Sequence, residues 1–137
     1  MPRLEMLINE VKRALALAES IVERPIQEFL DDDEAVFALR YAVVEVVEGC
    51  VQIGIHILKK LGVRAATYSE VFQRLYEKGV ITRSVAESMR RFVGLRNLIV
   101  HRYWEVDDER MYKELKEEGL RRVREYLESV AKYASVV

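Results

Sequence analysis

The chain has 137 residues, of which half are apolar and a third are charged, and its formal net charge is −1 at pH 7. This length and composition are typical of a single globular domain with a buried core, so we expect residues 1–137 to form one domain. The near-neutral charge excludes a strongly basic surface and leaves only local contacts with nucleic acid open. The one cysteine excludes an internal disulfide and a cysteine-based zinc site, and is typical of a reducing compartment.

No targeting or membrane segment is predicted. The first twenty residues carry charges every few positions, so they do not resemble a signal peptide. No segment approaches the ~20 uncharged apolar residues that a membrane span needs. We therefore expect a soluble, cytoplasmic protein without a membrane partner.

The first two predicted elements are long helices. Apolar residues spaced by three and four predict a helix over 3–24, which Pro25 should end or kink. A second helix is predicted over 33–61, because Asp31, Asp32 and Asp33 offer caps and negative charge at its start. Gly62 is the expected C-terminal residue. This second helix is so apolar that it should lie at the centre of the fold and contact neighbours on several sides.

A stripe of polar residues runs along the second helix. Its members recur at spacings of three and four, and they are Glu45, Glu48, Gln52, His56 and Lys59. Two interpretations stay open: the stripe is a solvent-exposed face, or it lines a cleft or a dimer interface.

The remaining elements are also predicted to be helices. The T-x-x-E capping box Thr67–Glu70 predicts a short helix that Gly79 closes. The same signature at Ser84–Glu87 predicts a fourth helix over 84–101.

A cap at Asp107 or Asp108 predicts the last helix, over 108–133. The sequence therefore predicts an all-α, up-and-down bundle of four long helices plus one short helix.

Reactive side chains gather in "RNLIVHRYW", residues 96–104: Arg96, Asn97, His101 and Tyr103. On a helix Asn97 and His101 share a face, and the long side chain of Arg96 can reach toward His101, so both could contact one phosphate. A purely structural explanation is also available, because cations near a helix C-terminus offset its dipole. Spacing alone does not decide between the two.

The pattern R-N-x-x-x-H-x-Y resembles the signature of the HEPN superfamily, specifically its HepT-like ribonuclease toxins, which carry it late in an all-α chain. The resemblance implies a metal-independent endoribonuclease, the toxin of a toxin–antitoxin pair. Arg96 and His101 are then the catalytic residues and Asn97 supports them, with no metal and no cofactor. This fits the chemistry of RNA cleavage, because histidine transfers protons near neutral pH and arginine offers a planar fork to phosphate oxygens.

The resemblance also implies partners. One motif histidine per chain cannot easily act as both base and acid, so a homodimer should bring two copies of Arg96 and His101 to a shared cleft. His56 is better explained as a surface or interface residue than as a second catalytic group. Tyr103 matches the tyrosine that a minimal nucleotidyltransferase antitoxin modifies with AMP, which would block entry of the RNA.

The sequence leaves two other classes of function open. HEPN-like bundles also serve as non-catalytic nucleotide- or RNA-binding subunits of nucleotidyltransferases, and a plain dimerisation module is the third possibility. The presence of both Arg96 and His101 favours the nuclease. Di-iron, phosphate-loop and nucleophile-elbow chemistry is excluded, because no E-x-x-H pair, glycine-rich loop or elbow motif occurs.

Overall fold

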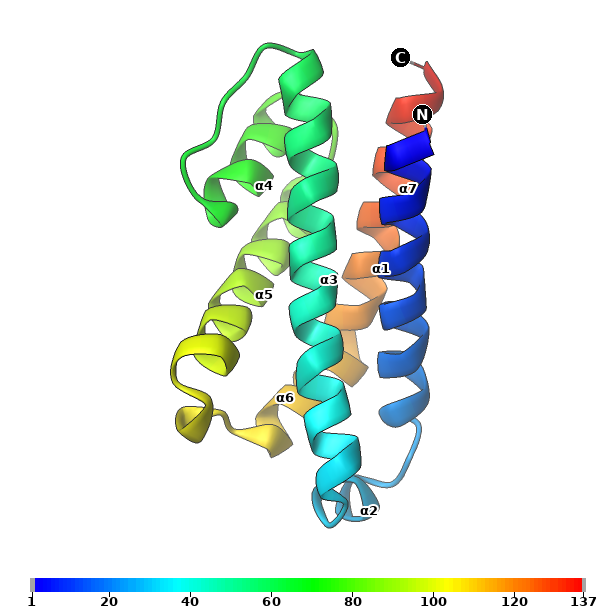
Figure 1. Ribbon diagram of the computed structural model, residues 1–137, viewed down its shortest axis with the longest axis vertical. Coiled ribbons are helices and arrows are strands. Elements are labelled where there is room, and N and C mark those ends of the chain that lie inside the picture. Colours follow the sequence, from blue (N-terminus) through cyan, green and yellow to red (C-terminus); the bar gives the residue numbers. More distant parts are fainter. Residues whose placement is uncertain (1, 137) are drawn as a thin grey trace.

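A computed structural model of the protein describes residues 2–136, and every regular element in that range is helical. Four long helices run along the molecule (Figure 1): α1 (Pro2–Ile21), α3 (Asp33–Lys60), α5 (Arg83–His101) and α7 (Leu120–Val136). The shorter elements are α2 (Ile26–Leu30), α4 (Tyr68–Glu77), η1 (Tyr103–Glu105), α6 (Asp108–Glu114) and η2 (Leu115–Gly119). The prediction of an all-α bundle with four long helices is confirmed.

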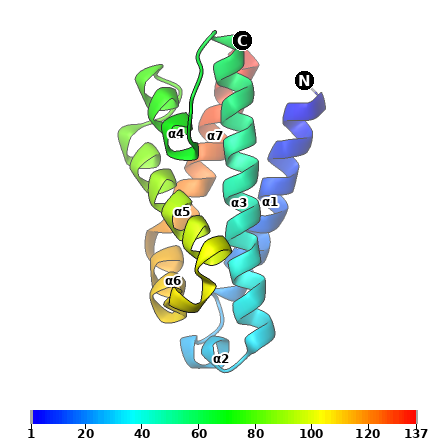
Figure 2. The same cartoon turned by 60° about the vertical axis from the view of Figure 1, so that its left-hand side comes forward.

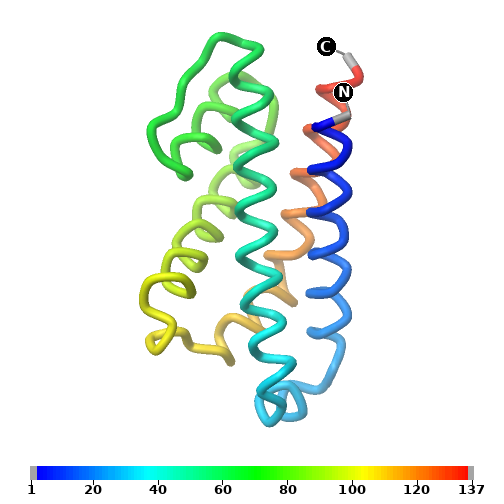
Figure 3. The backbone as a smooth tube through the Cα atoms, viewed as in Figure 1, coloured from blue at the N-terminus to red at the C-terminus, as the bar shows by residue number. Residues whose placement is uncertain are grey.

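The long helix α3 stands in the middle of the bundle. In Figure 1, α1 lies on one side of it and α4 and α5 lie on the other, while α7 passes behind. The tube in Figure 3 shows that the chain begins and finishes at one end of the bundle, opposite α2. The short turn η1 follows α5, so it lies at the end of the bundle away from the termini.

Close packing around α3 depends on two of its glycines. A Cβ atom on Gly49 would lie 2.3 Å from Val11 of α1, and one on Gly54 would lie 2.5 Å from Val71 of α4. Side chains at these positions would push α1 and α4 away. The buried Tyr126 hydroxyl of α7 donates to the carbonyl of Cys50 (2.7 Å), and burial raises the pKa of the Cys50 thiol, so it stays protonated.

By length and composition alone, α3 could cross a membrane. In the bundle, 56% of its most apolar 18-residue window is buried against the other helices. The apolar residues of α3, which predicted a central helix, therefore pack against other helices on several sides.

Most predicted helix ends are confirmed. The Asp32 carboxylate accepts from the N–H of Ala35 at the start of α3, and the Thr67 hydroxyl accepts from the N–H of Glu70 at the start of α4. Gly62 and Gly79 follow α3 and α4 with φ of 71° and 75°, the left-handed conformation that glycine adopts without strain.

Two predicted helix ends were wrong, and one short helix was missed. The N-cap of α5 is Thr82, whose hydroxyl accepts from Val85, so the Ser84–Glu87 capping box does not form. The first helix ends at Ile21, and Pro25 precedes the short helix α2, which was not predicted.

The last helix is also not uniform, because a π-helical turn, η2, separates α6 from α7. Gly119 in this turn packs so closely on Phe92 of α5 that an added Cβ would lie 3.2 Å from the ring.

Candidate functional site

The motif occupies the end of α5 that the bundle covers least. The buried residues of α5 stop at Val93. Leu98 and Ile99 are only half-buried, and Val100 is exposed. The last two turns of α5 therefore present a partly open surface.

Arg96 is held by three neighbours. Its Nε and Nη2 donate to Oε1 of Glu48 on α3, at 2.8 and 2.7 Å. Its guanidinium lies over the ring of Tyr68, 5.2 Å from the ring centroid, and Nη1 donates to Oδ1 of Asn97 at 3.1 Å. Tyr68 in turn donates its hydroxyl to Oε2 of Glu48 at 2.7 Å. The four side chains form one network, which we call the Arg96 network: Arg96, Glu48, Tyr68 and Asn97.

The Arg96 network leaves part of the guanidinium open. Arginine has five N–H donors, and three are engaged here, one each on Nε, Nη1 and Nη2. The two that remain, one on Nη1 and one on Nη2, make no hydrogen bond to a described residue and are left to bind phosphate oxygens. The hydrogen bond to Glu48 raises the pKa of the Tyr68 phenol, so Tyr68 stays neutral and keeps donating.

Glu48 was not recognised as a site residue in the sequence. It was placed in the polar stripe, without a partner. Its role depends on the pairing of α3 with α5, which brings residues 48 positions apart into contact, and no local pattern predicts such a pairing. The structure thus joins Arg96 to Asn97, Glu48 and Tyr68, contacts that the sequence did not predict.

His101 is the last residue of α5 and its side chain is exposed. Within the described residues, the imidazole has no hydrogen-bond or ion-pair partner, and it does not join the Arg96 network. Arg102 closes the helix, and its N–H donates to the carbonyl of Leu98 at 2.8 Å. A single chain therefore offers one solvent-facing histidine on the same helix as the anchored Arg96.

Tyr103 and Trp104 project from the η1 turn, just beyond His101. Their side chains are exposed, and the two rings meet edge to face with centroids 5.3 Å apart. Arg40 of α3 holds the turn in place. Its Nη1 donates to the carbonyl of Tyr103, and its Nε and Nη2 donate to the two carboxylate oxygens of Asp108 at 2.8 Å. Tyr103 therefore reaches solvent from an ordered turn.

His56 lies on a different side of α3. It lines a cavity of about 180 Å³ with residues of α1 and α7, among them Leu4 and Tyr133. Burial lowers the pKa of His56, and the charge of Lys60 acts in the same direction. Glu48 instead faces α4 and α5. Two members of the predicted polar stripe, His56 and Glu48, therefore face other helices, on different sides of α3. Its other members are exposed to solvent: Glu45, Gln52 and Lys59.

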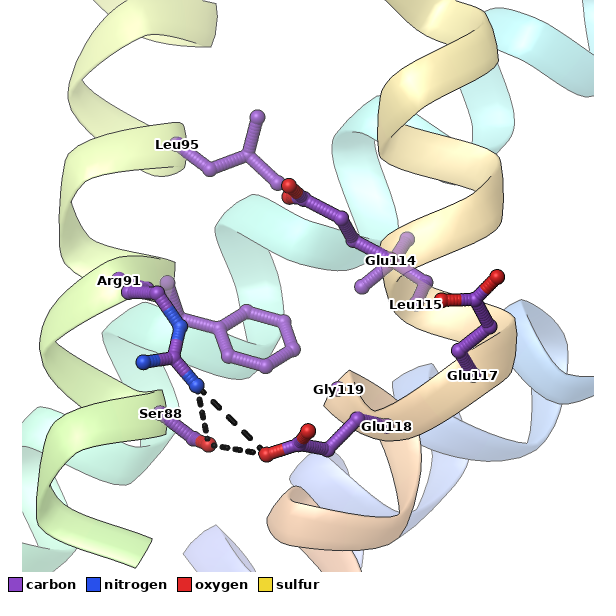
Figure 4. Close-up of a pocket in the computed structure, with 9 residues that line it drawn as sticks. Ser88, Arg91, Leu95, Glu114, Leu115, Glu117, Glu118 and Gly119 are labelled. Carbon is purple, nitrogen blue, oxygen red and sulfur yellow. Dashed lines mark hydrogen bonds and ion pairs between the residues drawn. The ribbon is translucent and has the colours of Figure 1, made fainter. Parts of the chain in front are cut away.

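A second cavity, of about 230 Å³, opens between α5 and the π turn η2. Figure 4 shows Ser88, Arg91 and Glu118 joined at its edge, with Arg91 donating to Ser88 at 3.1 Å. Its carboxylates are largely paired with arginines, as in Arg110–Glu114 and Arg122–Glu118. Across residues 2–136, no three His, Cys, Asp or Glu side chains gather in a metal-binding arrangement.

The protein is thus an all-α bundle with an arginine and a histidine near the end of its third long helix, α5, and a tyrosine in the turn that follows. Residues 11–130 match the family described as Ribonuclease HepT-like, so the chain belongs to the HepT-like ribonuclease family.

Individual relatives agree with this assignment. A protein of Archaeoglobus fulgidus named "Putative RNase" is 32% identical over 130 residues, which cover 90% of this chain and 92% of the relative. The crystal structure of a toxin–antitoxin with AMP-PNP superposes with a TM-score of 0.88 at 18% identity, covering 96% of this chain and 99% of that chain. The tri-AMPylated Shewanella oneidensis HEPN toxin, in complex with MNT antitoxin, gives 0.85 at 19% identity, covering 94% and 96%. At these identities the two structures establish a shared fold.

Proposed function

We propose that the protein is the toxin of a toxin–antitoxin pair, a single-domain, cytoplasmic endoribonuclease that cleaves RNA without a metal ion. The observation that carries this proposal is the pairing of an anchored Arg96, with two N–H donors still open, with an exposed His101 on the last turns of α5. Membership of the HepT-like ribonuclease family supports the same chemistry.

Each residue of the proposed site has a separate role in the cleavage of RNA. A histidine takes the proton of a ribose 2′-hydroxyl, whose oxygen attacks the neighbouring phosphorus and expels the 5′-oxygen of the next nucleotide. Arg96 stabilises the negative charge that grows on the phosphate oxygens during this step. A second histidine returns a proton to the leaving oxygen, so the reaction consumes no other reagent. Asn97 supports the site by orienting Arg96.

Two histidines of this kind require two copies of the chain, so the active form is a homodimer with both Arg96–His101 pairs in one cleft. Exposed apolar residues support an interface on α3, where Phe37, Tyr41 and Ile55 lie on one side of the helix. Val100 of α5 is exposed beside the motif. Figure 2 shows one face of α3, between α1 and α5, that no other helix covers. Apolar surface of this kind is typical of sites where another protein binds.

Regulation is proposed at Tyr103. Its ring is 61% exposed, so a minimal nucleotidyltransferase antitoxin could reach the hydroxyl. AMP attached there would bring a phosphate and an adenosine to the mouth of the cleft, where they repel and obstruct RNA. A structural relative described as a tri-AMPylated HEPN toxin in complex with MNT antitoxin supports such a modification here.

The direct test is RNA cleavage by the purified protein in buffer with EDTA. We expect cleavage to persist with EDTA and to disappear in His101→Ala, with unchanged helical circular dichroism. His56→Ala is the matched control and should cleave normally, because His56 faces α1 and α7. Loss of activity with EDTA, or full activity of His101→Ala, would refute the mechanism. Binding of RNA without cleavage by the wild type would instead indicate a non-catalytic binding subunit.

A further inference from the structure

We propose that the indole of Trp104 is a stacking surface for one unpaired nucleobase of the RNA, beside the bond that is cleaved. Trp104 would thereby hold in place the nucleotide next to the cleavage position. This inference rests on the proposed function only in that RNA is the ligand, and its test separates base binding from cleavage.

The exposure of Trp104 is the first observation. Its side chain is 68% exposed, more than any other large hydrophobic side chain that the structure describes. Exposing an indole to water is unfavourable, and most of Trp104 stays open to solvent although the ring of Tyr103 meets it edge to face. Tyrosine and tryptophan in such positions are typical of surfaces that bind a ligand.

The turn that carries Trp104 is held in place, which is the second observation. The N–H of Glu105 donates to the carbonyl of Arg102 at 2.9 Å, and that of Val106 donates to the carbonyl of Tyr103. Arg40 holds the same carbonyl of Tyr103 and is itself fixed by Asp108. A flat ring on an ordered turn loses little conformational freedom when a base stacks on it.

The position of Trp104 suits a base that flanks the reacting phosphate. Trp104 is three positions after His101, so the two Cα atoms are at most about 11 Å apart. Bases of single-stranded RNA are unstacked easily and bind by stacking on aromatic side chains, with little dependence on sequence. A nucleotide whose phosphate lies near Arg96 and His101 can therefore place a neighbouring base on Trp104.

The charges on either side of Trp104 favour a base over a phosphate. Basic residues precede it, Arg96, His101 and Arg102, while the acidic residues Glu105, Asp107 and Asp108 follow. Arg40 pairs with Asp108 and Arg102 pairs with Glu105, whereas Asp107 makes no ion pair with a described residue. The phosphates of RNA should stay on the basic side, and the uncharged base is the part that can extend toward the acidic side.

Fluorescence tests the contact directly, because Trp104 is the only tryptophan in the chain. A single-stranded oligonucleotide is titrated into His101→Ala, which should bind without cleaving. We expect the emission to be quenched on binding. In a series of otherwise identical oligonucleotides that each lack one base, a single member should bind without quenching. Binding with unchanged emission for the intact oligonucleotide overturns the proposal.

Kinetics provide the second test, on the wild-type background. Trp104→Ala should raise KM by about 5- to 100-fold, the effect expected for loss of one stacked base, and leave kcat nearly unchanged. Trp104→Phe should recover most of the loss, because it restores an aromatic face. Tyr76→Ala, which removes another exposed aromatic ring on α4, is the matched control and should behave as wild type.

The two proposals fail differently. Quenching without cleavage by the wild type would sustain the stacking site and refute the nuclease. Cleavage that is insensitive to Trp104→Ala would sustain the nuclease and refute the stacking site. A shift of Trp104→Ala to monomer in analytical ultracentrifugation would also overturn the inference, because it would assign Trp104 to the contact between two copies.

Discussion

Arg96 on α5 and Glu48 on α3 form an ion pair, with Nη2 of the arginine 2.7 Å from Oε1 of the glutamate. The Arg96 side chain is 19% exposed and that of Glu48 is 36% exposed, so water screens the pair only in part. Because Glu48 also accepts from Tyr68, the carboxylate is fixed on both oxygens. The ion pair makes α3 part of the candidate site and sets which edge of the guanidinium faces outward.

We predict that Glu48→Gln lowers kcat for RNA cleavage about 10-fold or more, since a hydrogen bond to a charged group contributes about 1.5–3 kcal/mol. The amide keeps the size of the side chain but loses the charge, and it cannot accept from Arg96 and Tyr68 as a carboxylate does. Arg96 should then sample other orientations. Steady-state kinetics with a short RNA measure the effect.

Glu45→Gln is the matched control for this prediction, because Glu45 lies one turn away on α3 and is exposed. It should cleave within about twofold of wild type, as exposed charges contribute little. Equal losses in both variants would show that the overall charge of α3 matters rather than the ion pair with Arg96.

Local signals predicted most of the fold. Helical spacing of apolar residues located all four long helices, and Asp32, Thr67, Gly62 and Gly79 mark helix ends as their residue types predict. The short helix α2 was missed because five residues give little more than one turn, too few for a periodic pattern. Thr82 was passed over for Ser84 because both residues have capping side chains two positions apart, and only the backbone conformation decides between them.

The candidate site was predictable in part. Arg96, Asn97, His101 and Tyr103 form a contiguous motif, so a linear pattern locates them. Glu48 and Tyr68 join Arg96 only through the packing of α3 and α4 against α5, and the sequence carries no signal for that contact.

Alanine substitutions at Gly54 of α3 and at Gly94 of α5 should have opposite effects on the free energy of unfolding. Gly54→Ala should lower the free energy of unfolding by about 1–3 kcal/mol, because the new Cβ would lie 2.5 Å from Val71 and 3.2 Å from the Tyr126 hydroxyl. Gly94→Ala should raise it by about 0.5–1 kcal/mol, since alanine favours helix and a Cβ there has open space. Urea unfolding at one protein concentration measures both.

Whether Gly94→Ala raises or lowers the free energy of unfolding also tests whether a second copy of the chain packs against α5. If this variant were destabilised while Gly54→Ala behaved as predicted, a second copy must pack against Gly94. Stabilisation of Gly54→Ala would contradict the close contact of α3 with α4.

If two chains share each active site, an inactive chain should abolish the activity of the wild-type chain with which it pairs. Wild type is mixed with a tenfold excess of His101→Ala, under conditions in which subunits exchange. Because each cleft would need a histidine from both copies, only pairs of wild-type chains should be active, and activity should fall about tenfold. His56→Ala in the same excess should cause no fall. Undiminished wild-type activity in the first mixture would show that one chain suffices.

The last prediction concerns Tyr103 and a partner nucleotidyltransferase. Incubation with the cognate enzyme and ATP should add the mass of AMP to the tryptic peptide that contains Tyr103, and cleavage of RNA should fall in parallel. Tyr103→Phe should escape modification and stay active in the presence of the partner, because it lacks only the hydroxyl that accepts AMP. Tyr76→Phe is the matched control, since Tyr76 is an exposed tyrosine on α4, and it should be modified and silenced like the wild type. AMP on Tyr103 with cleavage intact would refute the switch, and modification of Tyr103→Phe at another residue would assign the acceptor elsewhere.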